Sequence, residues 1–137
     1  DIARRTFDIV LSKVDNPKGR WNKAAAGARA MKSFALPMIL CNVGLEIEHL
    51  LTPEFLQQTI DTCIHEVMDV FYRPELGLIV EHLSLDNELV DCMDGRLMNP
   101  GHAIEAMWFI MDLGKRLHRP ELIEKACHIA LAEAEYG

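Results

Sequence analysis

Apolar residues recur at intervals of three and four along most of the chain, which places them on one face of an α-helix. The clearest case is residues 36–51, where this spacing predicts an amphipathic helix. It also predicts helices over residues 2–14 and 53–72, and helices that begin at Pro100 and Pro120. The expected inward faces are Ile2, Phe7, Val10, Leu11 and Val14; Leu36, Ile39, Leu40, Val43, Ile47, Leu50 and Leu51; Phe55, Leu56, Ile60, Cys63, Ile64, Val67, Met68 and Phe71; Ile104, Met107, Trp108 and Met111; and Leu122, Ile123, Ala126, Ile129 and Ala130.

Capping residues and prolines mark where these helices start and stop. Thr52-Pro53 and Asn99-Pro100 each pair a polar N-cap with a proline at the first helical position. Ser33 is the expected cap of the 36–51 helix. Asn16-Pro17-Lys18-Gly19 should end the first helix, because proline lacks an N–H donor and glycine tolerates a positive φ. Residues 20–32, rich in alanine, glycine and basic residues, are expected to form a long loop.

Residues 76–90 interrupt the helical pattern. Leu78-Ile79-Val80 is apolar and β-branched, and Asp86-Asn87 is a turn signal before Leu89-Val90, so we expect a short β-hairpin. Helix pairs stacked side by side form either a solenoid or, if the array closes, an α/α barrel. We therefore expect an all-α fold of helix hairpins with a β-hairpin insertion. Residues 1–137 are expected to be a single partial domain of a longer protein, because both ends fall within helical patterns.

Composition excludes several classes of partner. A formal net charge of −7 argues against a nucleic-acid ligand, and no apolar run is long enough for a membrane span. The four cysteines, none in a Cys-x-x-Cys pair, are expected to be reduced thiols of a cytoplasmic protein. We expect no metal centre: Glu46 and His49 have the i, i+3 spacing of a di-iron ligand pair, but a second such pair is missing.

The candidate chemistry lies in Asn99-Pro100-Gly101-His102-Ala103-Ile104-Glu105-Ala106-Met107-Trp108. With Asn99 as the cap, His102 is the third helical residue, and Glu105 and Trp108 follow at successive intervals of three. Imidazole exchanges protons near neutral pH, and a tryptophan ring can stack on a sugar. A first-turn histidine is often only a helix-end group, however, and a tryptophan in an apolar stripe is usually core. The spacing alone does not decide between these interpretations.

Three segments are similar to members of the N-acylglucosamine 2-epimerase family. The most specific is Asn99-Pro100-Gly101-His102-x-x-Glu105-x-x-Trp108-Phe109. The others are Asn16-Pro17-Lys18-Gly19 with Trp21-Asn22-Lys23, and residues 32–42, which end on Cys41-Asn42. The resemblance covers nearly the whole chain, although family chains are considerably longer. It implies an (α/α)6 barrel with the active site in its central cleft.

The resemblance also implies roles for four residues. His102 would be a proton-transferring acid/base, and Glu105 would orient it or contact substrate. Asn42 would contact the sugar from an inner helix, and Trp108 would contact it or line the wall of the site. A second catalytic histidine and an arginine that polarises the substrate oxygen belong to parts of the family chain outside this segment. His118, His128 and Arg29 do not match those motifs.

The implied reaction interconverts N-acetylglucosamine and N-acetylmannosamine by removal and return of the proton at C2. The resemblance implies a small-molecule sugar as the partner and no bound cofactor, with ATP as an allosteric activator of some relatives; a homodimer is left open. Two alternatives stay open as well: a related aldose–ketose isomerase acting on mannose or sulfoquinovose, and a non-catalytic helical-repeat binding domain. Glu81 and His82 fall in the expected hairpin near the cleft, where a structural role is more common than substrate contact.

Overall fold

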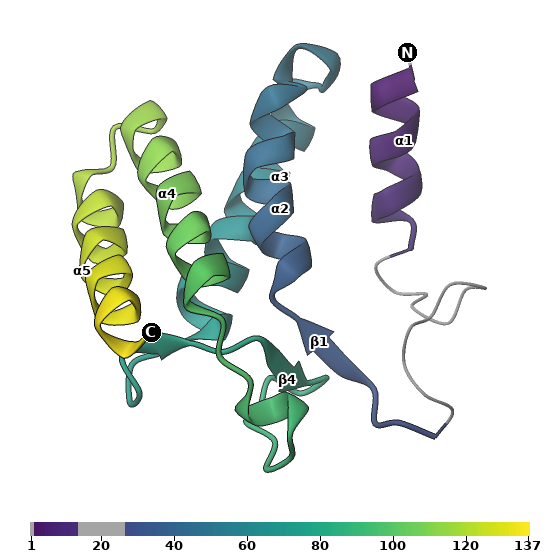
Figure 1. The fold of residues 1–137 in the computed structure, drawn as a ribbon. Coiled ribbons are helices and arrows are strands. Elements are labelled where there is room, and N and C mark those ends of the chain that lie inside the picture. The colour runs from purple at the N-terminus through teal and green to yellow at the C-terminus, as the bar shows by residue number, and fades with distance from the viewer. Residues whose placement is uncertain (1, 14–26) are drawn as a thin grey trace.

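The computed structural model describes residues 2–13 and 27–137, and most of them are helical (Figure 1). The predominantly helical prediction is therefore confirmed for these ranges. The α-helices are α1 (Ile2–Leu11), α2 (Ala35–Glu46), α3 (Pro53–His65), α4 (Pro100–Arg116) and α5 (Pro120–Tyr136). Shorter helical segments are the 3₁₀-helices η1 (Glu48–Leu50) and η3 (Asp94–Arg96) and the π-helical η2 (Glu66–Phe71). The strands are β1 (Met31–Ser33), β2 (Tyr72–Arg73), β3 (Leu78–Ile79) and β4 (His82–Ser84).

The two predicted N-caps form as expected. The Thr52 hydroxyl oxygen accepts the backbone N–H of Phe55 at 3.3 Å, and Asn99 Oδ1 accepts that of His102 at 3.4 Å. Pro53 and Pro100 open α3 and α4, where the missing N–H leaves no intrahelical bond unmade. The Asn99 cap fixes the first turn of α4, and with it the position of His102.

The helices pack as consecutive hairpins. α2 packs on α3 and on α4, and α4 packs on α5. In Figure 1, α2 and α4 both rise from the end of the molecule that carries β1 and β4, while α3 and α5 run back toward it. The hydrophobic core lies between these helices and the strands, and its fully buried members include Phe34, Val67, Phe71, Val80, Leu83, Met107, Ile110, Leu113 and Ala126.

The predicted β-hairpin is wrong in its pairing. Leu78-Ile79 pairs with Tyr72-Arg73 across a tight turn, which places the first hairpin earlier in the chain than expected. β4 pairs with β1, so that His82 lies opposite Ser33. The Asp86-Asn87 turn does form, since Asn87 has a φ of 65°, but Leu89-Val90 is not a strand. The strand partner of β4 comes from residues 31–33. The sequence could not predict this pairing, because a local turn signal carries no information about a segment so distant in the chain.

That pairing also corrects the expected loop before α2. Met31 and Lys32, predicted as loop, belong to β1, and Ser33 ends that strand, while Phe34 occupies the N-cap position of α2. The Ser33 hydroxyl still accepts the backbone N–H of Ala35, at 3.4 Å. α2 ends at Glu46, earlier than predicted, because the chain tightens into η1 with i to i+3 hydrogen bonds such as Leu50 to Ile47.

The buried face of α4 differs from the predicted stripe. Ile104 and Trp108 are exposed, Trp108 by 62% of its surface, whereas Met107 is buried. The helix packs against both α2 and α5, and its buried face includes small residues that allow close approach. That face consists of Ala103, Ala106, Met107, Phe109, Ile110, Leu113 and Gly114.

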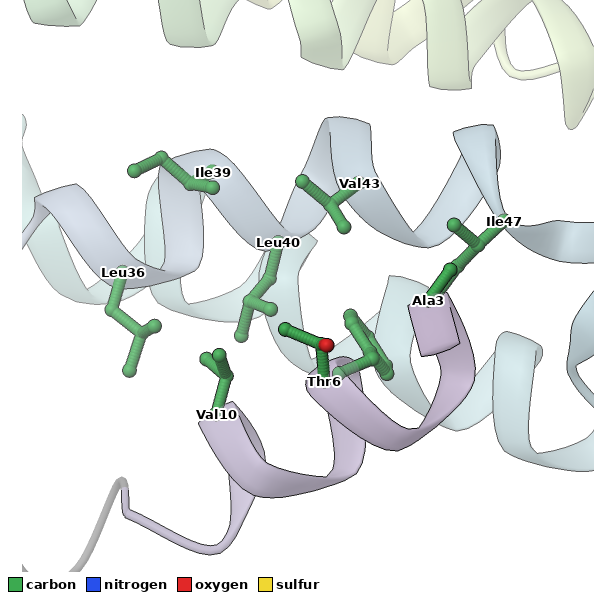
Figure 2. A pocket seen from close by; sticks show the side chains of 9 residues that line it. Ala3, Thr6, Val10, Leu36, Ile39, Leu40, Val43 and Ile47 are labelled. Atoms are coloured by element: carbon green, nitrogen blue, oxygen red, sulfur yellow. The ribbon is translucent and has the colours of Figure 1, made fainter. Parts of the chain in front are cut away.

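α1 lies beside α2 (Figure 1) and also contacts α3. The Phe7 ring meets that of Phe55 edge-on at 6.3 Å, and Phe7 is the buried residue of this helix. Figure 2 shows Leu36 and Leu40 of α2 pointing toward α1 across an apolar pocket of about 340 Å³. Of the predicted inward residues of α1, Ile2 and Val10 are exposed. Val14, the Asn16–Gly19 stop and the Trp21-Asn22-Lys23 motif lie outside the described residues.

Candidate active site

His102 is the third residue of α4, as predicted, and its side chain is 41% exposed. Its ring is not a solvated helix-end group, because Nδ1 lies 2.9 Å from Oε1 of Glu81. The Glu81 side chain is only 7% exposed. One nitrogen of the imidazole thus faces a buried carboxylate from a different part of the chain, while the ring as a whole remains accessible.

Glu81 is held in place by its own backbone. It lies between β3 and β4, where its carbonyl accepts the N–H of Phe34 at 2.9 Å and its N–H donates to the carbonyl of Leu97 at 3.2 Å. Phe34 immediately precedes α2, and Leu97 immediately follows η3 on the way to α4. The residue that contacts His102 is therefore tied to the segments leading into both α2 and α4.

The contact determines which ring nitrogen carries the proton in the neutral imidazole. A carboxylate only accepts hydrogen bonds, so Nδ1 must donate its N–H to Glu81. The other nitrogen, Nε2, is then left with a lone pair. A half-exposed imidazole held in this tautomer can remove a proton from a molecule placed beside it and afterwards return one.

A second buried carboxyl, that of Glu133 in α5, contacts strand β3 near Glu81. Glu133 is fully buried, and its Oε1 accepts the backbone N–H of Ile79 at 2.6 Å. Burial raises the pKa of Glu133 above its ordinary value, the hydrogen bond from Ile79 opposes this rise, and the charge of nearby Glu81 adds to it. Its other oxygen, Oε2, is buried without a hydrogen-bond partner in the described part of the chain.

Asn42 and Trp108 line one pocket between α2 and α4, of about 190 Å³. Its remaining walls are Leu45, Glu46, Phe109 and Asp112. Two of the four predicted site residues are thus brought together from helices far apart in sequence. The pocket has both polar and apolar walls, and much of the surface of Trp108 is exposed.

His102 does not line this pocket, although it shares α4 with Trp108. Six residues of α-helix correspond to a rise of about 9 Å and a rotation of roughly 120° about the axis. Glu105 lies between them in height and direction, and is exposed. No hydrogen bond or ion pair of the Glu105 side chain is found within residues 2–13 and 27–137, so its predicted orienting role stays a prediction.

The larger pocket, between α1 and α2, offers no comparable chemistry. Thr6 supplies its only polar side chain, and the Thr6 hydroxyl already donates to the carbonyl of Ile2. Across the described ranges, no three His, Cys, Asp or Glu side chains gather as a metal site would need. Glu46 and His49 are exposed. None of the described helices combines the length and apolarity that crossing a membrane requires.

Sequence reasoning placed Glu81 near the cleft with a structural role but did not foresee its contact with His102, and it missed Glu133 altogether. Both interrupt apolar patterns: Glu81 directly follows Leu78-Ile79-Val80, and Glu133 extends the inward stripe of α5 by one further turn. A carboxyl at a buried position needs a polar partner, so such an interruption is itself a signal. The identity of the partner could not be predicted, because the contacts join segments distant in sequence.

Comparisons with known proteins identify the family of this chain. The family model for N-acylglucosamine 2-epimerase (GlcNAc 2-epimerase) matches residues 5–137. The chain is 32% identical to the N-acylglucosamine 2-epimerases of Mus musculus and Rattus norvegicus over 113 residues, 79% of its own length, and to that of Bos taurus over 114 residues. It spans 26% of the length of these relatives. With a family match that includes the His102 helix, the chain belongs to the N-acylglucosamine 2-epimerase family.

Proposed function

We propose that the protein to which this chain belongs interconverts N-acetylglucosamine and N-acetylmannosamine at C2, with His102 as one of two acid/base groups. The observation that carries the proposal is the contact of His102 Nδ1 with buried Glu81, which leaves Nε2 of an accessible ring free to exchange a proton. The names of the relatives support the same reaction.

The reaction requires a group that can take up and return a proton, which an accessible imidazole can do. Opening the sugar ring gives an aldehyde, which acidifies the hydrogen on C2. Nε2 of His102 takes that proton on one face and an enolate forms; a second acid returns a proton to the opposite face. Because the acetamido group at C2 blocks conversion to a ketose, epimerisation is the outcome. A placed acid/base contributes about 10²- to 10⁴-fold in rate.

The remaining predicted residues would bind the sugar. Trp108 offers an exposed ring for stacking on the apolar face of the substrate, and Asn42 shares its pocket. Glu105, between His102 and Trp108 on α4, is placed to accept a hydrogen bond from a sugar hydroxyl. The substrate would therefore extend along α4, with its reacting carbon near His102 and the rest of the molecule toward the Asn42–Trp108 pocket.

We further propose that the helices form part of an (α/α)6 barrel with α2 and α4 in its inner layer. α2 and α4 contact each other and run in the same direction, and each is covered by its own hairpin partner, α3 or α5. Ile39 of α2 and Trp108 of α4 nevertheless expose much of their surface. An inner layer that lines a central cleft accounts for exposed apolar groups on these two helices.

Activation by ATP and a homodimer are proposals that rest on the family resemblance, and a cytoplasmic location is a proposal that rests on the spacing of the cysteines. The four cysteines are free; Cys41 and Cys63 are buried and Cys127 is exposed.

The function is tested with the full-length protein and N-acetylmannosamine in deuterated water. The proposal predicts N-acetylglucosamine that carries deuterium at C2. Formation of N-acetylglucosamine without solvent deuterium, or no conversion at all with or without ATP, would end it. Turnover of mannose to a ketose, with no action on the acetamido sugar, would instead identify an aldose–ketose isomerase.

A further inference from the structure

We propose that Glu81, and not Glu105, is the carboxylate that positions His102 for proton transfer, and that Glu133 holds Glu81 in place through strand β3. The inference rests on the proposed function, because it concerns the same proton transfer. Glu81 is a positioning residue in this account: it acts on the ring nitrogen that faces away from the substrate.

The first argument is the geometry of the pair. Glu81 is buried and its Oε1 lies 2.9 Å from His102 Nδ1. Within the described residues, His102 is the only hydrogen-bond partner of the Glu81 side chain. A buried carboxylate is stable only with such a partner, so each group restrains the other. The imidazole is fixed in orientation and in tautomer by one contact.

The second argument is the rigidity of the backbone around Glu81. Its carbonyl and N–H are both bonded, to Phe34 and Leu97, in the segments that lead into α2 and α4. One residue earlier, the N–H of Val80 donates to the carbonyl of Phe71 at 3.1 Å. A side chain on a backbone tied at three places keeps its position when the ring beside it gains or loses a proton.

The third argument is the anchor from α5. Ile79 precedes Glu81 by two residues, and its N–H ends on the fully buried carboxyl of Glu133. This bond attaches β3 to α5, which packs along α4. Glu133 therefore links strand β3, two residues before Glu81, to the helix hairpin that carries His102. Both glutamine and methionine at position 133 would keep the core packed. Only glutamine has an oxygen that could accept the N–H of Ile79.

Glu105 is different in every one of these respects. It is exposed, it makes no hydrogen bond or ion pair within the described ranges, and one helical turn separates it from His102. Its direction from the α4 axis differs from that of His102 by roughly 60°. Its carboxylate is thus available to substrate, and a substitution there should change sugar binding more than the state of the imidazole.

The test combines nitrogen NMR of the imidazole with kinetics on the full-length protein. In the wild type, neutral His102 should carry its proton on Nδ1, with Nε2 unprotonated. Glu81→Gln should change that pattern and lower kcat by about 10²-fold or more, as expected for a histidine that loses its orienting carboxylate, with KM changed by less than about threefold. Glu81→Asp should restore part of both, whereas Glu105→Gln should keep the wild-type tautomer and raise KM.

The outcomes separate the two proposals. An inactive wild type with the proton on Nδ1 would end the proposed function but keep the positioning role. A wild type with the proton on Nε2, or Glu81→Gln with kcat within about twofold of wild type, would overturn the positioning role whatever the activity.

The anchor from α5 has its own test. Glu133→Gln should retain kcat and Glu133→Met should lower it; equal kcat in the two would overturn the anchor. Glu124→Gln, on the exposed face of α5, is the matched control for folding.

Discussion

Asn42 of α2 and Trp108 of α4 face the same pocket, although α3 and strands β2, β3 and β4 lie between them in sequence. Their proximity depends on the direct packing of α2 on α4. The site is therefore not a property of the His102 helix alone. It needs the second helix to supply a polar wall and the strand segment to supply Glu81.

Removal of the Trp108 ring should weaken sugar binding. Because 62% of the residue is exposed, Trp108→Ala should cost little stability. Loss of stacking worth about 0.5–1.5 kcal/mol corresponds to a KM roughly two- to tenfold higher. Steady-state kinetics on the full-length protein measure this. Leu131→Ala, which removes an exposed apolar group from α5, is the control and should leave KM unchanged. An unchanged KM in Trp108→Ala would place the sugar elsewhere.

The cap of α4 should influence both stability and catalysis. Asn99 Oδ1 accepts the N–H of His102, so Asn99→Ala removes a bond to the residue that we propose as the acid/base. We expect a loss of about 1 kcal/mol in the free energy of unfolding and a lower kcat. Asn99→Asp retains a capping oxygen and should retain both. Equal loss of activity in the two variants would show that the cap is not the cause.

Gly114 lies where α4 approaches the start of α5 closely. A Cβ at this position would lie 2.8 Å from Ile123 Cγ1 and 3.2 Å from the carbonyl oxygen of Arg119. Gly114→Ala should therefore force the helices apart and cost about 1–3 kcal/mol in the free energy of unfolding.

Gly44 provides the matched comparison, because a Cβ there meets only Thr59 Cγ2, at an ordinary 3.7 Å. Gly44→Ala should be neutral or stabilise α2 by up to about 1 kcal/mol. Denaturant unfolding of the two variants measures the difference. A Gly114→Ala variant as stable as Gly44→Ala would contradict the helix packing described above.

Much of the fold followed from local signals. The Thr52 and Asn99 caps, the prolines after them and the apolar spacing of α3 and α5 predicted helices that the structure contains, because such signals act within one turn. The pairing of β1 with β4 and the burial of Glu81 were beyond such reasoning. Both depend on contacts between distant segments, and only the interruption of an apolar run by Glu81 hinted at them.

Stability should depend on the ionisation of Glu133. Burial raises its pKa above the ordinary 4.5, so the folded protein binds this proton more tightly than the unfolded chain. The contribution of Glu133 to stability is then present at low pH and falls as pH rises from the ordinary pKa through the raised one. Glu133→Gln lacks this loss and keeps an oxygen for Ile79. Its stability relative to wild type, measured by urea unfolding, should therefore improve as pH rises above the ordinary carboxyl pKa of 4.5. A difference independent of pH would refute the assignment.

The central claim, that His102 exchanges the C2 proton on one face of the sugar, is tested most directly by hydrogen exchange from each epimer separately. In full-length His102→Ala, solvent deuterium should no longer enter C2 of the epimer whose proton His102 removes, while His128→Ala, which alters an exposed histidine of α5, should exchange normally. Exchange at the wild-type rate from both N-acetylglucosamine and N-acetylmannosamine in His102→Ala would contradict the account.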